Sequence, residues 1–528
     1  MKFFSISLLI PCFVLLFSIP AKAQPNNLAE DARSAMLEAT RYMVEEVSTN
    51  GGYVYHYMPD FSRRWGEVEA YPTQIWIQPS GGTLGMGHLF LDAYAVTGDE
   101  YYYQAAAGVG KALAWGQHPS GGWNYMVDFA GDRSLKRWYE TIGKNAWGFE
   151  EFQHYYGNAT FDDDVTAGAA RFLLRLYLEK LDPSFRPALD QAIEFILESQ
   201  YPLGGWPQRY PLKYDYTKGG KADYTSFYTF NDDVMENNIE FLILCYKTLG
   251  EERLLDPIRR GMNFYLLAQQ GNPQGGWALQ YTMDLAPAHA RSYEPAALST
   301  GTTVDHIRLL FRFYRYTGDR KFLARIPDAI DWLDRSRLTG DMTEGNRYTH
   351  STFVEVATDK PLYAHRRGSG VTEGHYWVDY NDEPPLRHYG TKKTIDTDEL
   401  REEYERVRAL SSEQAFRDSP LKPGRHQKNG TPGDNFPEMQ FPDRTPDESE
   451  VQAVIRDLDR QGRWIITGEE VGRAYSPPYS VSGDGVETNT RMLSVEEYAR
   501  ERDPSGEQYL STREYIKNMR LLIGYINR

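Results

Sequence analysis

Two acidic clusters and two arginines are the residues of this chain whose types and spacing could do chemistry. Asp162-Asp163-Asp164 and Asn231-Asp232-Asp233 each open a predicted helix, and Arg291 and Arg366 follow further along the chain. Asp and Asn are also strong helix N-caps, because their side-chain oxygens accept hydrogen bonds from free N–H groups of the first turn. A single cluster of this kind would therefore be explained by capping alone.

The arrangement recurs along the chain, and this recurrence favours a shared site. A Gly-Gly-aromatic motif follows a helical segment four times, with intervals of 70, 83 and 71 residues between the aromatic residues Tyr53, Trp123, Trp206 and Trp277. Helix hairpins repeated at such a period cannot bury their apolar faces singly and must stack on their neighbours. We predict a mainly α fold, an α/α toroid or incomplete barrel of helix hairpins, with an open solenoid as the alternative.

Equivalent helix starts in a ring lie at one end of it. The starts near 80–83, 162–164, 231–233 and 300–303 would then surround one mouth. Carboxylates that converge there repel one another unless a cation lies between them, and hard oxygen ligands suit Ca²⁺. A nearby arginine suits an anionic ligand, because a guanidinium matches a carboxylate with two hydrogen bonds. The simpler explanation for Arg291 is a salt bridge to Glu294.

The two ends of the chain differ from this repeat. Residues 1–23 predict a secretory signal peptide, with an apolar run that ends at Ala21-Lys22-Ala23. We therefore expect export to the periplasm or the exterior. Cys245 is the only cysteine after this segment, so no internal disulfide is expected. We expect the toroid over 24–400, including a small irregular or β region, and a C-terminal extension over 401–528 that packs on it.

Composition excludes some partners. The formal net charge is −16, and an acidic surface argues against nucleic acid or an anionic membrane, since either would need a basic patch. No apolar run after the signal segment is long enough to span a membrane. Aromatic residues make up 14% of the chain, which suits sugar binding and helix packing equally. We expect a monomer.

Several segments together resemble the family-10 polysaccharide lyases, which are pectate lyases built on an α/α toroid. The similar segments are TFDDDVT, GGWPQRYP, TFNDDVM, ARSYEP and KPLYAHRRG, at residues 160–166, 204–211, 229–235, 290–295 and 360–368. The resemblance spans roughly residues 162–368, with a weaker echo at the C-terminus. The combination of GGWPQ-x-YP with a following FNDD is quite specific.

The resemblance implies cleavage of polygalacturonate (pectate) by Ca²⁺-assisted β-elimination, with 4,5-unsaturated oligogalacturonides as products. It implies Arg291 as the catalytic base and Asp162, Asp232 and Asp233 as metal ligands. It also implies that substrate is bound by Asn231, Arg366, Trp206, Gln208, Arg209 and Tyr293.

Three alternatives stay open. Tyr281 and Thr282 stand where family members carry a histidine and an aspartate, and Arg367 stands where they carry an aspartate. The substrate could therefore be another uronate polymer. A glycoside hydrolase on the same toroid would use Asp162 and Asp233 as its carboxyl pair. A glycan-binding protein that has lost catalysis is the third alternative.

Overall fold

The structure is a computed structural model that describes most of the chain. It covers residues 28–146, 149–214, 217, 220–367, 375–382, 391–422, 445–467, 479–482, 485–488 and 508–527. The predicted signal peptide at 1–23 lies outside these residues, and so does a large part of the predicted C-terminal extension. None of the described helices is both long and apolar enough to cross a membrane.

Four helix hairpins form the body of the molecule, and they confirm the predicted toroid. Each pairs a largely buried first helix with a second helix that buries one side, after a short break. The hairpins are α2 (Thr83–Thr97) with α3 (Glu100–Gly116), α5 (Val165–Lys180) with α6 (Arg186–Ser199), α7 (Val234–Leu249) with α8 (Leu255–Ala268), and α9 (Thr300–Thr317) with α10 (Ile326–Arg335).

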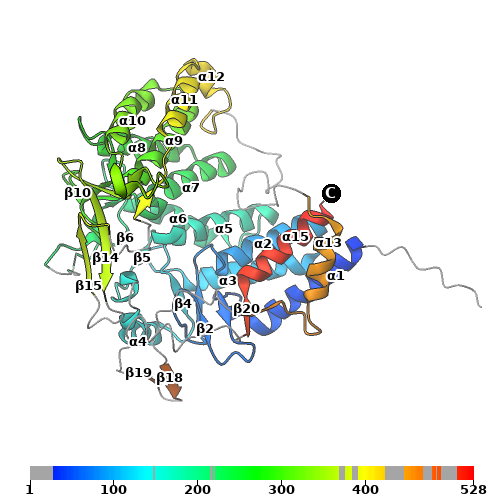
Figure 1. Cartoon of the computed structure of the whole chain (residues 1–528). Helices are drawn as coiled ribbons and strands as arrows, with labels where there is room; N and C mark the ends of the chain where they lie inside the picture. The colour runs from blue at the N-terminus through cyan, green and yellow to red at the C-terminus, as the bar shows by residue number, and fades with distance from the viewer. Residues whose placement is uncertain are drawn as a thin grey trace, which may run out of the picture.

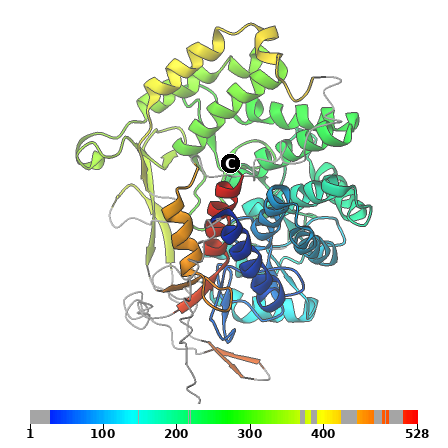
Figure 2. The same cartoon turned by 90° about the vertical axis from the view of Figure 1, so that its right-hand side faces the viewer.

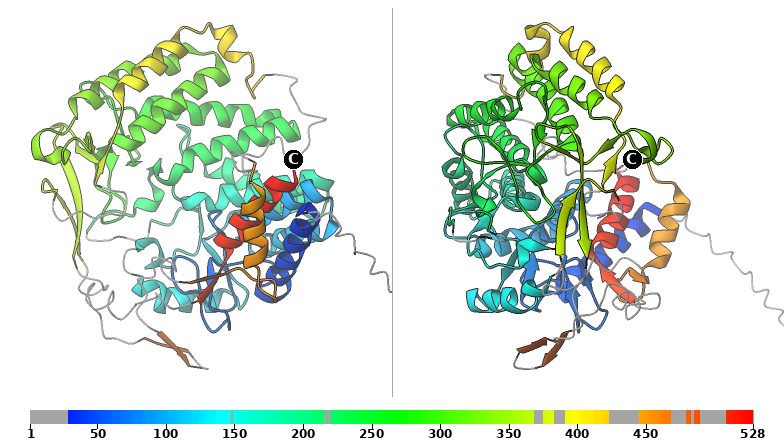
Figure 3. Two further views of the ribbon diagram at one scale, coloured as in Figure 1. Left: turned by 45° about the vertical axis from the view of Figure 1, so that its right-hand side comes forward. Right: turned by 60° about the vertical axis from the view of Figure 1, so that its left-hand side comes forward.

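The hairpins follow one another in an open arc (Figure 1 and Figure 3, left). The first helices α2, α5 and α7 contact one another in turn, so they form an inner row, and each second helix packs outside its partner. One continuous apolar core runs through the arc. The arc is an incomplete barrel, and the starts of its inner helices lie on one side.

The Gly-Gly-aromatic loops tie each outer helix to the next inner helix. The indole N–H groups of Trp123, Trp206 and Trp277 donate to the carbonyls of Leu113, Ile196 and Tyr265, near the ends of α3, α6 and α8. The backbone N–H of Trp123 donates to the Thr166 hydroxyl at the start of α5, and that of Trp277 donates to Thr303 in α9. The motif is therefore structural.

Short antiparallel strands follow the loops. The largest sheet has the order β15-β14-β13-β11-β8. Its strands are β8 (Trp277–Ala278), β11 (Ala297–Ser299), β13 (Phe353–Glu355), β14 (Pro361–Arg367) and β15 (His375–Asp379). The β14–β15 hairpin extends well beyond the helices on one side of the arc (Figure 1).

The remaining strands pair in twos to fours. They are β1 (His56–Tyr57), β2 (Arg64–Trp65), β3 (Gln74–Trp76), β4 (Met126–Asp128), β5 (Ala159–Thr160), β6 (Arg209–Tyr210), β7 (Tyr228–Thr229), β9 (Gln280–Tyr281), β10 (Pro287–Ala288), β12 (His350–Ser351), β16 (Lys392–Lys393), β17 (Ile465–Thr467), β18 (Tyr479–Ser482), β19 (Gly485–Thr488) and β20 (Gln508–Ser511). Pairs β5–β6 and β7–β9 lie directly before the two acidic clusters.

The two ends of the described chain lie side by side. Helix α15 (Thr512–Ile526) packs on α1 (Leu28–Tyr42), α2 and α13 (Glu448–Asp457), as Figure 2 shows. Helix α4 (Asp132–Thr141) follows β4. Helices α11 (Thr397–Arg408) and α12 (Ser412–Phe416) pack on α10 and α9. The predicted domain boundary at residues 400/401 falls inside α11 and stays a prediction.

Candidate active site

Two short 3-10 turns carry the acidic clusters. Turn η4 (Asp162–Asp164) leads into α5, and turn η6 (Asn231–Asp233) leads into α7. In both turns the last two residues have left-handed backbone, with φ between 50° and 55°. This conformation costs on the order of 1–3 kcal/mol per non-glycine residue. Neither Asp164 nor Asp233 caps its helix with its side chain, so capping does not explain the clusters.

Asp162, Asp163 and Asp232 form a carboxylate triad. Each offers an oxygen, and these oxygens lie within 4.8 Å of one another. Burial, together with the neighbouring Asp162, raises the pKa of Asp163 and Asp232 well above its usual range. Burial alone would also raise the pKa of Asp162, but Arg291 and hydrogen bonds from Asp232 and Tyr125 lower it. The buried carboxylates of the triad repel one another when ionised, and a nearby positive charge would stabilise their ionised forms.

Asp163 takes the place in this triad that the sequence assigned to Asp233. Asp233, which the sequence predicts as a metal ligand, is exposed and lies outside the group, and its role as a ligand stays a prediction. Successive residues of a left-handed turn point in different directions. The middle residue of each turn, Asp163 or Asp232, therefore joins the triad, while the last residue points away from it.

Arg291 lies against the triad and is almost completely enclosed by carboxyl groups. Its Nη2 is 3.0 Å from Asp232 Oδ2, and its Nη1 is 3.7 Å from Asp162 Oδ2. Glu294 holds the other edge of the guanidinium, with 3.0 Å contacts to Nε and Nη2. The side chain is 5% exposed. The salt bridge to Glu294, offered above as the simpler explanation, coexists with contacts to both acidic turns.

Two glutamates that sequence reasoning missed complete the acidic surroundings. Glu151 Oε2 lies 3.6 Å from Arg291 Nη1, and burial raises the pKa of Glu151 to about 8. Burial with the charges of Glu151 and Asp162 raises the pKa of Glu67 to about 8 as well. Gln78 Nε2 bridges Glu67 and Asp163, at 3.3 and 2.6 Å.

The sequence signal for these two residues is weak. Glu150-Glu151 is an adjacent acidic pair in an aromatic-rich loop, and Glu67 precedes the first hairpin. Neither belongs to the repeated pattern of helix starts. Only the packing of the loop that carries Glu151 against the mouth of the arc brings it to Arg291.

Four residues predicted to bind substrate are buried. Trp206, Gln208, Arg209 and Tyr293 are 0%, 2%, 2% and 1% exposed. Trp206 is part of the core and its indole N–H donates to the Ile196 carbonyl, and its predicted contact with substrate stays a prediction. The Arg291 guanidinium lies over the Tyr293 ring, 5.7 Å from its centre, and the predicted contact of Tyr293 with substrate stays a prediction.

Arg209 and Asn231 contact other residues around the site. The Arg209 guanidinium lies between the rings of Tyr125 and Tyr156, at 5.2 and 4.5 Å. Asn231 Nδ2 donates to Asp232 at 2.7 Å and to Glu294 at 2.9 Å, so it links the triad to the group that holds Arg291. Their predicted contacts with substrate stay predictions.

Gln208 and Arg366 differ from these. Gln208 Nε2 has no hydrogen-bond partner within the part of the chain that the structure describes. The backbone of Arg366 lies on β14, opposite Tyr376 of β15. The Arg366 side chain lies outside the described atoms, so its predicted role stays a prediction.

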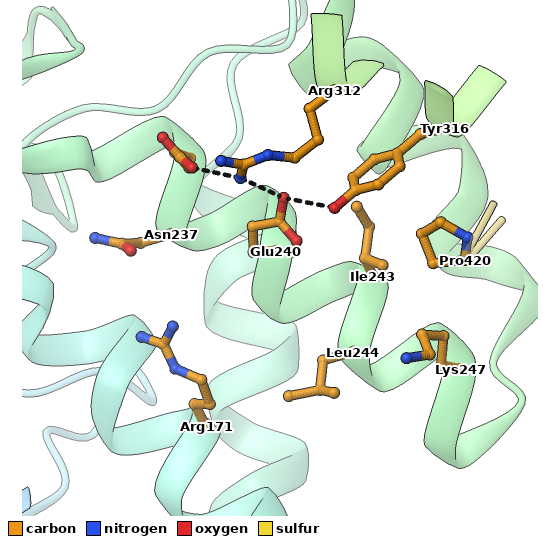
Figure 4. Close-up of a pocket in the computed structure, with 10 residues that line it drawn as sticks. Arg171, Asn237, Glu240, Ile243, Leu244, Lys247, Arg312, Tyr316 and Pro420 are labelled. Atoms are coloured by element: carbon orange, nitrogen blue, oxygen red, sulfur yellow. Dashed lines mark hydrogen bonds and ion pairs between the residues drawn. The ribbon is translucent and has the colours of Figure 1, made fainter. Parts of the chain in front are cut away.

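Two pockets open near these elements. One, of ≈ 260 Å³, adjoins the triad through Asp232 and is also lined by Asp233, Asp305 and Lys393. The other, of ≈ 340 Å³, lies between α5, α7 and α9 (Figure 4). In this second pocket the charges largely satisfy one another, since Arg312 Nη1 lies 2.6 Å from Glu236 and 3.2 Å from Glu240.

The donor set of the triad fits a hard divalent cation. It offers three carboxylates from two turns, and Asp162 Oδ1 is buried with no hydrogen-bond partner in the described chain. Carboxylate oxygens are the ligands that Ca²⁺ and Mg²⁺ prefer, while Zn²⁺ favours nitrogen and sulfur. The triad can therefore hold a metal ion, beside a guanidinium and a pocket.

Comparison with known proteins places this site in a family context. Residues 117–391 match the family model described as pectic acid lyase. No curated protein matches the chain. The triad, Arg291, Glu151 and Glu294 all lie inside the matched range, whereas Glu67 and Gln78 precede it.

Solved structures with a similar fold include the family 10 polysaccharide lyase from Cellvibrio cellulosa, at 18% identity and a TM-score of 0.40 over 61% of this chain and 98% of that one. A mutant of the same enzyme, in complex with trigalacturonic acid, matches at 17% identity and 0.40 over the same shares. Cellobiose 2-epimerase from Spirochaeta thermophila matches at 12% and 0.37, over 63% and 75%. The family assignment rests on the sequence match alone.

Proposed function

Because this chain belongs to the pectic acid lyase family, we propose that it cleaves polygalacturonate by calcium-assisted β-elimination and releases 4,5-unsaturated oligogalacturonides. We also propose that residues 1–23 direct its export. The observation that carries the proposed reaction is the contact of one buried arginine, Arg291, with carboxylates from both acidic turns. Proximity of a base and a cation site is what elimination from a uronate requires.

The reaction removes the C5 proton, which is α to the uronate carboxylate and only weakly acidic. The C5–H bond breaks, its electron pair forms the C4=C5 bond, and the C4–O4 bond breaks. O4 leaves with a proton taken from water. Negative charge builds up on the carboxylate in the transition state, so groups that bind this charge accelerate the reaction.

Asp162, Asp163 and Asp232 would hold the ion, and bound calcium would supply the positive charge that neutralises the uronate carboxylate. The protein's part is to keep these oxygens together. Tyr125 donates to Asp162, Gln78 to Asp163 and Asn231 to Asp232, so each carboxylate of the triad is fixed by a neighbour. This support holds the triad in place before substrate arrives.

Arg291 is the proposed base. Glu294 fixes two of its nitrogens and Tyr293 lies under its plane, so the guanidinium has one defined position. A guanidinium is strongly basic and normally protonated. Arg291 must release a proton before it accepts the one from C5, and it returns that proton to water afterwards. Its direct contact with the triad couples its charge to whatever binds there.

The two carboxyl groups of the hydrolase alternative have different surroundings. An inverting hydrolase needs two carboxyl groups that face one sugar, about 6.5–9.5 Å apart. Asp162 is completely buried and receives a hydrogen bond from Tyr125, whereas Asp233 is exposed on the wall of the neighbouring pocket.

The decisive experiment follows ultraviolet absorbance during incubation with polygalacturonate. We expect absorbance to rise from the conjugated C4=C5 product with Ca²⁺, and to stop on addition of a chelator. Arg291→Lys keeps the charge but loses the planar fork, so we expect it to lower kcat by about 100- to 1000-fold. New reducing ends without absorbance would show hydrolysis and contradict the proposal.

A matched variant separates chemistry from folding. Arg175 is also buried and paired with an aspartate, Asp92, but this pair links α5 to α2 in the core. Arg175→Lys should lower the Tm and leave the kcat of the folded enzyme unchanged. Binding of polygalacturonate without any product would favour the glycan-binding alternative.

A further inference from the structure

The pocket beside the triad contains charged groups that the proposed reaction does not use. We call it the Asp305 pocket; its walls come from η6, the start of α9, and the strands β13 and β16, and its charged residues besides Asp232 are Asp233, Asp305 and Lys393. Asp232 belongs both to this pocket and to the triad. A ligand in the pocket would therefore lie next to whatever binds at the triad.

The side chains of Asp233, Asp305 and Lys393 make no hydrogen bond or ion pair with the described part of the chain. Among the described residues, none of the three forms a side-chain hydrogen bond or ion pair, although most charged groups near the mouth of the arc are paired. Lys393 lies close enough to Asp305 to act on it electrostatically, yet the two form no ion pair within 4.0 Å. The pocket is thus lined by both carboxylate groups and an ammonium group, which are available to a ligand.

His306 gives an independent indication of a ligand. Its side chain lines the pocket, it is 6% exposed, and its Nδ1 has no hydrogen-bond partner within the described chain. The rings of Phe230 and Tyr265 pack against it at 4.5 and 4.8 Å. Buried polar atoms are nearly always hydrogen-bonded, so an unpartnered ring nitrogen at a pocket wall indicates a missing partner.

The position of Lys393 is set by the fold. Strand pairing places Lys393 opposite His350, and the lysine stem crosses the start of α9 over Gly301. A Cβ at Gly301 would lie 2.8 Å from Lys393 Cε, so the lysine stem passes in close contact over this glycine. The half-buried stem holds the ammonium group at the pocket.

We propose that the Asp305 pocket binds one hexuronate residue of the polymer, next to the residue that lies over the triad. Lys393 would pair with the carboxylate of this sugar, and Asp233 and Asp305 would accept hydrogen bonds from its hydroxyl groups. The volume of ≈ 260 Å³ is slightly below the roughly 300–1,000 Å³ of drug-sized ligand pockets, which suits one pyranose ring. This inference rests on the proposed function.

The test compares Lys393→Met and Asp305→Asn with wild type on polygalacturonate. A hydrogen bond to a charged group is worth about 1.5–3 kcal/mol, so each variant should raise KM roughly 10- to 100-fold while kcat changes little. Lys393→Arg keeps the charge and should recover part of the loss. Lys517→Met is the control, because Lys517 is 71% exposed and pairs only within α15.

The charge of the substrate supplies a readout that a structural defect would not move. On a heavily methyl-esterified polymer the carboxylate is neutral, so the KM penalty of Lys393→Met should largely disappear. An equal penalty on both polymers would overturn the pairing with Lys393, as would an unchanged KM for both variants on polygalacturonate.

Calorimetric titration with trigalacturonate separates this inference from the proposed reaction. Suppose that Lys393→Met binds trigalacturonate more weakly than wild type, and that wild type gives no elimination product. This result would support the pocket and contradict the lyase reaction. Active wild type, with trigalacturonate binding identical in all variants, would contradict the pocket and leave the reaction standing.

Discussion

At the scale of single residues, the site is built from a guanidinium inside a shell of carboxyl groups. Arg291 contacts Glu294, Asp232, Asp162 and Glu151, and it is almost completely buried. A structural ion pair would need one carboxylate for this guanidinium, whereas four carboxyl groups surround it. The excess of negative charge makes sense as a site that takes up a cation.

Glu151 provides a test at this scale. Its carboxyl group lies 3.6 Å from Arg291 Nη1, and burial raises its pKa to about 8, so it becomes ionised as the pH rises through that value. If the ionised form orients Arg291, kcat/KM should rise with pH around 8. Glu151→Gln should lower kcat/KM by about tenfold and remove this limb of the pH profile.

Glu69 is the matched control for that experiment. It is also buried, but it pairs with Arg63, with 2.7 Å between Oε2 and Nη2, in the segment before the first hairpin. Glu69→Gln should leave the pH profile of kcat/KM in place. A limb near pH 8 that survives in Glu151→Gln would assign the titration to another group.

At the scale of elements, the Gly-Gly-aromatic loops determine where each hairpin ends. Gly204 has φ of +108°, and a Cβ there would lie 2.1 Å from the carbonyl oxygen of Arg260 in α8. The loop before β6 therefore lies directly against the next outer helix. This close approach sets the position of β6 and of the turn η4 with which it is paired through β5.

Gly204→Ala should consequently destabilise the protein more than a glycine replacement at an open position. Gly98 also has positive φ, at +69°, but no atom lies within 4 Å of a Cβ built there. Gly98→Ala should cost about 1 kcal/mol from backbone strain alone, and Gly204→Ala at least twice as much. Thermal or urea unfolding of both variants measures the difference; equal costs would contradict the packing argument.

At the scale of the whole molecule, the last described segment closes against the first. Strand β20 pairs with β1, with Ser511 opposite His56, and α15 packs on α1 and α2. The Tyr515 hydroxyl bonds to Thr40 at 2.6 Å. The C-terminal helix thus covers the N-terminal end of the arc, where its apolar side finds the partner that its sequence requires.

This junction should loosen in acid. Burial, with the charge of Arg513, lowers the pKa of His56 to about 4, whereas an unfolded histidine titrates near 6.5. The unfolded chain therefore takes up its proton first as the pH falls. The stability that neutral His56 contributes is complete above pH 6.5 and is lost progressively between 6.5 and 4.

His56→Gln removes this titration. Its free energy of unfolding should fall by about 3 kcal/mol less than that of wild type between pH 7 and 4. Urea unfolding at several pH values, with chelator present, measures the two slopes. Parallel slopes would show that His56 is protonated without cost in the folded state.

Much of the fold could be predicted from the chain because its signals are local and repeated. The spacing of apolar residues, the Gly-Gly-aromatic loops and the polar helix starts each depend on a few neighbouring residues. Four hairpins and a common mouth follow from them by stacking. The expected pairing of Arg291 with Glu294 is also local, since only two residues lie between them.

The composition of the site required the tertiary structure. Which acids converge depends on the left-handed turns at Asp163 and Asp232, which send consecutive side chains to different places. Glu67 and Glu151 lie on loops outside the repeated pattern. Trp206 is buried in the core, where its indole N–H donates to a carbonyl of α6. The sequence alone determined the repeated hairpins and the family. Three-dimensional packing decided which polar side chains face one another, because burial and direction are properties of contacts between distant segments.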